Sequence, residues 1–311
     1  MKKELNPWVA AAIIAGAAVL IVVYLLFCLN GNDAGRGKYL NVRDRGSAVY
    51  LDGKTALVVI MASDKSCTWD TSSEYYDECC RKVFDFTAVA AEWLAEQGKR
   101  YGKELSFVYP ESADSSLLFY EGKVSADDIT DKSMMYTMHD DGMDVWDYID
   151  KNVRTDEIQA EYGCDNIAYL LFINAPDSSY PSYAFSAYEN KLEKPYEFAV
   201  CSFSRDNELK VVPATIAHEL LHTFGAPDFY TSDFLGRLYY VSDSFVEFMG
   251  ADFSDDIMYS TSEDGTHNRY TDKITQQISP ATAYYIGWLD TPPVDIDSFG
   301  MIHSQFDIKA S

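Results

Sequence analysis

Hydrophobic and polar positions follow two different patterns along the chain after about residue 50. Short, uninterrupted apolar runs at residues 56–61 and 167–173 predict buried β-strands. Apolar residues recur every three or four positions over residues 73–97, which predicts a long helix. Weaker patterns predict strands at 105–109, 117–120, 182–188 and 197–203, and a second helix at 143–153.

Strands that alternate with helices favour an α/β fold, in which helices cover both faces of a mixed, mostly parallel twisted sheet. The strand predicted at 197–203 is the last one before the next helical segment, and we expect it to lie at an edge of the sheet. An extended peptide can bind such an edge as an additional strand. The predicted edge is therefore a candidate binding surface.

The amino-terminal region has a third pattern. Residues 8–29 carry no charge, and a helix of roughly 20 apolar residues is long enough to cross a bilayer. No small-residue cleavage site of a secretory signal peptide follows this segment. We therefore expect a short tail and a retained membrane anchor at residues 1–30, a linker at 31–46 and one main domain at 47–311.

Basic residues flank the predicted anchor on both sides, so the positive-inside rule does not decide its direction alone. Lys2 and Lys3 precede the anchor, and Arg36 and Lys38 are among the basic residues that follow it. The short tail is easier to retain in the cytoplasm than the main domain. We expect a single-pass protein of the cell membrane whose main domain is extracellular.

The net charge restricts the classes of binding partner, and the cysteines allow disulfides. The 311 residues have a formal net charge of −24, and a chain this acidic repels a phosphate backbone, which argues against nucleic-acid binding. One of the six cysteines, Cys28, lies in the predicted anchor. Among the others, a disulfide between Cys67 and either Cys79 or Cys80 is possible, since sequence alone does not define connectivity.

The strongest chemical signal is the sequence PATIAHELLHTFGAPD at residues 213–228. Residues 215–224 have helical character, and residues four apart on a helix share a face, so His218 and His222 can bind one metal ion together. Glu219 can contact a water molecule at that ion. Two neutral nitrogen ligands, an open coordination position and a nearby carboxylate are what zinc-assisted hydrolysis requires. The motif therefore predicts a Zn²⁺ site.

The residues after the helix supply a candidate third ligand. Gly225 can end the helix in a left-handed conformation, and Pro227 cannot extend it. The resulting turn can bring Asp228 back toward the ion. The alternative is that Gly225 only ends the helix and Asp228 is an ordinary turn residue.

The segment 218–228 resembles the extended metzincin signature, with Asp in place of the usual final His. The run GAPDFY at residues 225–230 is similar to bacterial secreted peptidases related to immune inhibitor A. Residues 256–259 look like the Met-turn of that family. The resemblance implies that Met258 forms a hydrophobic floor under the ligands, and that Tyr259 is a candidate for stabilising the transition state. It also implies a further helix, for which residues 281–288 are suited.

The same resemblance implies a metzincin-like division of the main domain. Its upper part would be residues 47–225, ending in the active-site helix, and residues 226–311 would form a smaller, irregular subdomain. The implied activity is that of a zinc metalloendopeptidase. In such an enzyme a peptide or protein is the substrate, and Glu219 is the general base toward metal-activated water.

Two alternatives remain open at the level of sequence. A thermolysin-like site would keep the same histidines but recruit a distant glutamate, for which Glu247 is the best candidate. A surface-anchored binding domain without activity would keep the fold but not the chemistry. Separate substitution of Asp228 and Glu247, followed by measurement of bound zinc, distinguishes the thermolysin-like site, and peptide cleavage distinguishes the inactive domain.

Overall fold

The structure is a computed structural model that describes residues 51–63, 67–123, 141–176, 180–185, 196–204, 211–231, 241–262 and 270–301. All of these residues belong to the unit formed by Val42–Lys309. The predicted membrane anchor and linker lie outside the described residues. Within the described part, no helix is long and apolar enough to cross a membrane.

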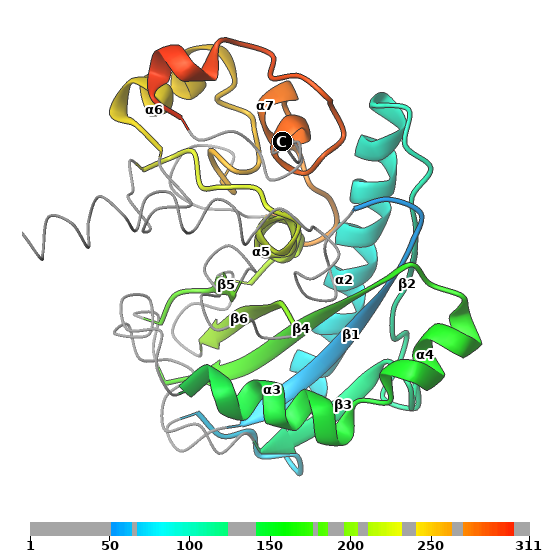
Figure 1. Cartoon of the computed structure of the whole chain (residues 1–311). Helices are drawn as coiled ribbons and strands as arrows, with labels where there is room; N and C mark the ends of the chain where they lie inside the picture. Colours follow the sequence, from blue (N-terminus) through cyan, green and yellow to red (C-terminus); the bar gives the residue numbers. More distant parts are fainter. Residues whose placement is uncertain are drawn as a thin grey trace, which may run out of the picture. The chain divides into compact units, whose positions relative to one another are not determined.

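Six strands of the described chain form one sheet, in the order β2-β1-β4-β6-β5, with β3 also paired to β1 (Figure 1). The strands are β1 (Lys54–Ser63), β2 (Ser106–Val108), β3 (Phe119–Lys123), β4 (Asn166–Ala175), β5 (Tyr183–Phe185) and β6 (Phe198–Ser204). The pairs are parallel except for β5 and β6, which are antiparallel. The sheet is therefore mixed and mostly parallel, as the sequence pattern predicts.

The central strands are uninterrupted apolar runs because both of their faces are covered. Successive side chains of β1 point to opposite faces, and they divide between two hydrophobic clusters accordingly. Leu57, Val59 and Met61 belong to one cluster, and Ala56, Val58 and Ile60 belong to the other. The sheet thus separates two cores, and only the first of them includes residues of the motif helix.

Helices cover the two faces unequally. The helices are α2 (Glu74–Arg100), α3 (Asp141–Asn152), α4 (Thr155–Tyr162), α5 (Pro213–Thr223), α6 (Asp243–Asp252) and α7 (Pro280–Tyr285), followed by the 3₁₀ helix η4 (Ile296–Phe299). Buried residues of α2 and α5 share the first cluster, whereas those of α3 and α4 belong to the second (Figure 1). The motif helix α5 therefore lies on the same face of the sheet as the long helix α2.

Most predicted elements are confirmed with small shifts of their ends, but the predicted edge is wrong. Strand β6 lies between β4 and β5, so the edge of the described sheet on this side is β5. The aromatic rings of Phe185 and Phe198 stack with their centroids 5.4 Å apart, and this apolar contact helps hold β5 along β6. Any edge recognition on this side of the sheet would therefore involve β5 instead of β6.

The cysteines follow the apolar pattern. Cys67, Cys79, Cys80, Cys164 and Cys201 are all buried and form no disulfide with one another. Burial raises the pKa of Cys80 to about 11, which keeps its thiol protonated at neutral pH. The possible pairing of Cys67 with Cys79 or Cys80 is therefore absent from this structure.

Candidate metal centre

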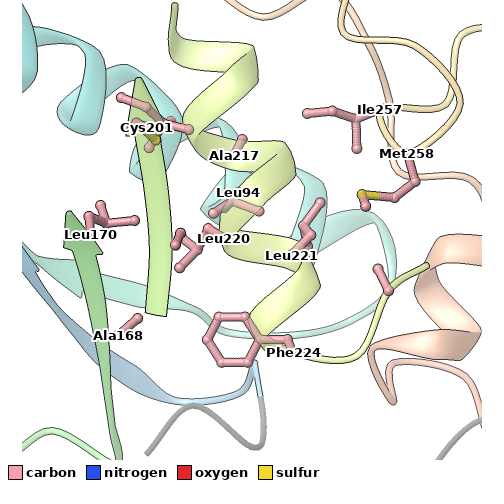
Figure 2. Close-up of a cluster of buried hydrophobic side chains, with 14 of the residues drawn as sticks. Leu94, Ala168, Leu170, Cys201, Ala217, Leu220, Leu221, Phe224, Ile257 and Met258 are labelled. Atoms are coloured by element: carbon pink, nitrogen blue, oxygen red, sulfur yellow. The ribbon is translucent and has the colours of Figure 1, made fainter. Parts of the chain in front are cut away.

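Helix α5 presents one face to the core and carries the motif on another. It begins at Pro213, whose fixed φ suits a first turn, and Ala217, Leu220 and Leu221 are fully buried. Figure 2 shows these side chains among residues of the sheet, of α2 and of the loop that contains Met258. The helix is therefore held firmly by apolar packing, and its polar residues are positioned by that packing.

The two histidines of α5 point their Nε2 atoms at each other, 3.1 Å apart. The Nδ1 atom of His218 lies 2.9 Å from the carbonyl oxygen of Ile257, and that of His222 lies 2.7 Å from the carbonyl oxygen of Ala226. A carbonyl oxygen only accepts hydrogen bonds, so each Nδ1 carries a proton and donates it. In the neutral state, both Nε2 atoms therefore present lone pairs, which is the arrangement of metal-binding imidazoles.

The chain turns sharply after α5 and returns Asp228 to the histidines. Gly225 has a φ of 101°, which only glycine adopts readily, and its N–H donates to the carbonyl oxygen of His222 at 2.9 Å. Asp228 Oδ1 then lies 3.1 Å from His218 Nε2 and 3.3 Å from His222 Nε2. The structure thus brings together the three residues that the sequence predicts as ligands.

These three atoms fit a single zinc ion. Ligand atoms arranged tetrahedrally at about 2.0–2.1 Å from zinc lie about 3.3–3.4 Å from one another, close to the observed separations of 3.1–3.3 Å. Apart from these two imidazoles, no described residue donates a hydrogen bond to the buried Asp228 Oδ1. When the imidazoles are neutral, three lone pairs converge and repel one another, and either protons or a metal cation between them removes the repulsion.

The charges of the histidines and of Asp228 also favour a bound cation. Burial alone would lower the pKa of His222, but the facing Asp228 carboxylate dominates and raises it to about 10. Burial would raise the pKa of Asp228, yet the two histidines, His222 foremost, hold it far below its usual range. Without a metal, protons on the imidazoles balance the carboxylate. A dication can replace those protons, as metal binding at histidine sites commonly does.

Glu219 is the fourth member of the candidate metal centre, which we define as His218, Glu219, His222 and Asp228. Its side chain is only 6% exposed, and its Oε2 atom has no hydrogen-bond partner among the described residues. One ligand atom each from Glu219 and the two histidines lie within 4.8 Å of one another. Burial raises the pKa of Glu219, although the nearby histidines counteract part of this effect. A carboxylate in this environment is well placed to accept a proton.

The loop at 256–259 connects the centre to the carboxyl-terminal part of the chain. Its Ile257 carbonyl oxygen is the acceptor for His218 Nδ1, and its Met258 carbonyl oxygen accepts a hydrogen bond from Phe229 N–H at 2.8 Å. The Met258 side chain is fully buried and belongs to the same hydrophobic cluster as Leu221 of α5 (Figure 2). The loop therefore supports both the helix and the segment that carries Asp228. Its role as a Met-turn stays a prediction.

The two remaining predicted residues lie apart from these contacts. Glu247 is exposed on α6, whereas Asp228 faces the imidazoles. The hydroxyl of Tyr259 lies against Gly250 of α6, where an added Cβ would be 2.6 Å from it. The geometry therefore gives no support to Glu247 as a ligand, and the role of Tyr259 in the transition state stays a prediction.

Two residues of this region do not stand out in the sequence. The hydroxyl of Tyr230 donates to Asp228 Oδ2 at 3.2 Å, and its ring centroid lies 6.3 Å from that of His218. Asp256 is fully buried and accepts hydrogen bonds from Met258 N–H at 2.7 Å and Ser279 N–H at 2.8 Å. The sequence includes Asp256 in the Met-turn-like segment and places Tyr230 two residues after Asp228, but it assigns neither side chain a role, because both act through contacts formed on folding.

No protein-family model matches the chain, and no curated protein matches it significantly. Its function must therefore be inferred from the residues and geometry of the centre. The firmest of these observations is the set of three ligand atoms within 3.3 Å of one another.

Proposed function

We propose that this chain is a zinc-dependent endopeptidase of metzincin type. His218, His222 and Asp228 would hold the metal, and Glu219 would act as the general base. The observation that carries the proposal is the convergence of two Nε2 atoms and one buried carboxylate oxygen, Asp228 Oδ1, with separations of 3.1–3.3 Å. Groups in this arrangement are costly to bury unless a cation joins them.

The chemistry divides between the metal and the side chains. When bound, zinc supplies a Lewis acid that polarises a carbonyl group and lowers the pKa of water. Glu219 accepts the proton of the attacking water molecule and delivers it to the leaving amine. The burial of Glu219 favours this role, because a carboxylate removed from water takes a proton more readily than an exposed one. The carbonyl oxygens of Ile257 and Ala226 hold both imidazoles in the metal-binding tautomer.

A sheet edge beside the motif helix supports a peptide as substrate. Strand β5 pairs with β6 on one side, and no described strand pairs with its other side. An extended peptide can therefore add to β5 through backbone hydrogen bonds. Helix α5 packs against β5, so a peptide bound at this edge would lie close to the helix that carries Glu219.

The proposal extends to the location of the enzyme. The uncharged segment at residues 8–29 suits a membrane anchor, and we propose that it tethers an extracellular catalytic domain. Residues 47–225 would form the upper part of that domain, and residues 226–311 would form the smaller lower part. Substrates would then be peptides or proteins present at the outer cell surface.

The test uses the full-length chain, purified in mild detergent, together with the variants Glu219→Gln and His218→Ala. We expect about one zinc per parent chain, retained in Glu219→Gln and lost from His218→Ala. The parent should cleave casein or a peptide library, and both variants should be nearly inactive. Cleavage by Glu219→Gln at the rate of the parent would exclude the mechanism. A parent chain that binds zinc but cleaves no peptide would instead favour a binding domain without activity.

A further inference from the structure

Tyr230 is the one large hydrophobic side chain of the described residues that is mostly exposed, at 54%. It follows Asp228 by two positions and lies beside the candidate metal centre. Its ring is tilted by 31° against the ring of His218, with centroids 6.3 Å apart. Its hydroxyl donates a hydrogen bond of 3.2 Å to Asp228. An exposed aromatic residue that contacts two candidate ligands needs an explanation beyond packing.

The hydrogen bond distinguishes the two oxygens of Asp228. The Tyr230 hydroxyl donates to Oδ2, and Oδ1 is the atom that faces both Nε2 atoms. The two oxygens are chemically equivalent, and partial rotation about the Cβ–Cγ bond would turn both of them away from their partners. The hydrogen bond to Tyr230 opposes that rotation, because it forms only when one oxygen faces the hydroxyl and leaves the other toward the histidines.

Among the described residues, each candidate ligand then has one outer partner. The Ile257 carbonyl oxygen holds His218, the Ala226 carbonyl oxygen holds His222, and the Tyr230 hydroxyl holds Asp228. Outer partners of this kind fix the orientation of metal ligands and adjust their basicity. Two of the three are backbone atoms that substitution cannot remove. Tyr230 is the only one supplied by a side chain.

We propose that Tyr230 is the positioning residue of the third ligand: it holds Asp228 so that Oδ1 binds the metal. The inference rests on the proposed function, because it presupposes that Asp228 is a ligand. Tyr230 acts through Asp228 and need not contact the substrate. Loss of its hydroxyl should therefore weaken metal binding even when no substrate is present.

The test measures zinc affinity of the full-length chain by competition with a chromophoric chelator. Tyr230→Phe removes the hydroxyl and keeps the ring, and should weaken zinc binding about tenfold, the low end of the effect of outer-shell substitutions. Tyr196→Phe is a matched control. It removes another exposed Tyr–Asp hydrogen bond of 3.2 Å, between Tyr196 and Asp150, whose tyrosine packs against the second core. Zinc affinity should be unchanged in this control.

A double-mutant cycle shows whether Tyr230 acts through Asp228. In the Asp228→Ala background, His218 and His222 still bind zinc weakly, and adding Tyr230→Phe should cause no further loss. An equal loss in both backgrounds would overturn the positioning role, as would an unchanged affinity in the single variant. A parent chain that binds no zinc would overturn the proposed function and this inference together. A parent that binds zinc with an unaffected Tyr230→Phe would overturn this inference alone.

Discussion

Two connected regions of the chain bury acidic side chains in opposite ways. In the candidate metal centre, Glu219 Oε2 is buried without a hydrogen-bond partner among the described residues, and Asp228 Oδ1 faces only the two imidazoles. In the loop that supports the centre, both oxygens of Asp256 accept hydrogen bonds, from two backbone N–H groups and the hydroxyl of Thr282. The loop and the centre meet where the carbonyl oxygen of Ile257 accepts the hydrogen bond of His218.

We interpret the difference as one between an acidic group that serves folding, Asp256, and two that are candidates for function. A buried polar group that is fully hydrogen-bonded stabilises one arrangement of its neighbours, whereas an unpartnered one costs free energy. Natural proteins retain such costs mainly where function requires them. We therefore expect substitutions at Asp256 to act on folding, and those at Glu219 and Asp228 to act on zinc binding and catalysis.

The largest effect is expected from Glu219→Gln. Loss of a general base lowers kcat by about 10³-fold, while the amide fills the same space without a buried charge. The free energy of unfolding of the metal-free protein should therefore not fall, and should rise by about 1 kcal/mol. Kinetics on a peptide substrate and urea unfolding measure the two quantities. A loss of both activity and stability would mean that Glu219 is structural, like Asp256.

Asp256→Ala, unlike Glu219→Gln, should lower the free energy of unfolding. It leaves the N–H groups of Met258 and Ser279 and the hydroxyl of Thr282 without their acceptor in a buried site, which costs about 3–5 kcal/mol. Asp256→Asn keeps the volume and one acceptor oxygen, so its loss should be smaller. Urea unfolding of metal-free chains measures both variants. A cost below 1 kcal/mol for Asp256→Ala would remove the contrast between the two regions.

A third prediction concerns the identity of the third ligand. Asp228→Ala should weaken zinc binding by about 100-fold, since a second-shell change alone costs 10- to 100-fold. Glu247→Ala should leave the affinity unchanged, because Glu247 is exposed on α6. Chelator competition measures both. The reverse order of effects would support a thermolysin-like site and place Asp228 among the ordinary turn residues.

The parts of the fold that follow from sequence are those with a strong local pattern. Strands β1 and β4 are covered on both faces and therefore appear as continuous apolar runs. Helix α4 was not predicted because Ile158 is its only fully buried residue, which leaves no apolar periodicity. The edge position of β5 was not predicted either. The sequence predicts a strand at 182–188, but strand order depends on long-range pairing that a local pattern does not contain.

In the candidate metal centre, too, the sequence predicts only what local spacing determines. His218, Glu219 and His222 are related by helical spacing, so the sequence alone places them together. Asp228 required the turn at Gly225, which glycine and proline indicate only indirectly. The partners of these residues were not predicted, because the contacts of Ile257 and Tyr230 form only when distant or irregular segments fold.

The smallest loss of stability is expected from a substitution at the amino-terminal end of α7. It tests whether Asp256 or the cap of α7 is the main anchor of the loop. The Ser279 hydroxyl accepts hydrogen bonds from Ala281 N–H at 3.2 Å and Thr282 N–H at 3.4 Å, so it caps the helix. Ser279→Ala should lower the free energy of unfolding by about 1 kcal/mol, as loss of a helix cap commonly does. The loss should be no larger, because the Ser279 backbone N–H remains and still donates to Asp256. Ser73→Ala, which removes the cap of α2, is the matched control. Both variants should keep the zinc affinity of the parent in chelator competition. If Ser279→Ala destabilised the chain as much as Asp256→Ala, the helix cap and not the carboxylate would be the main anchor of the loop.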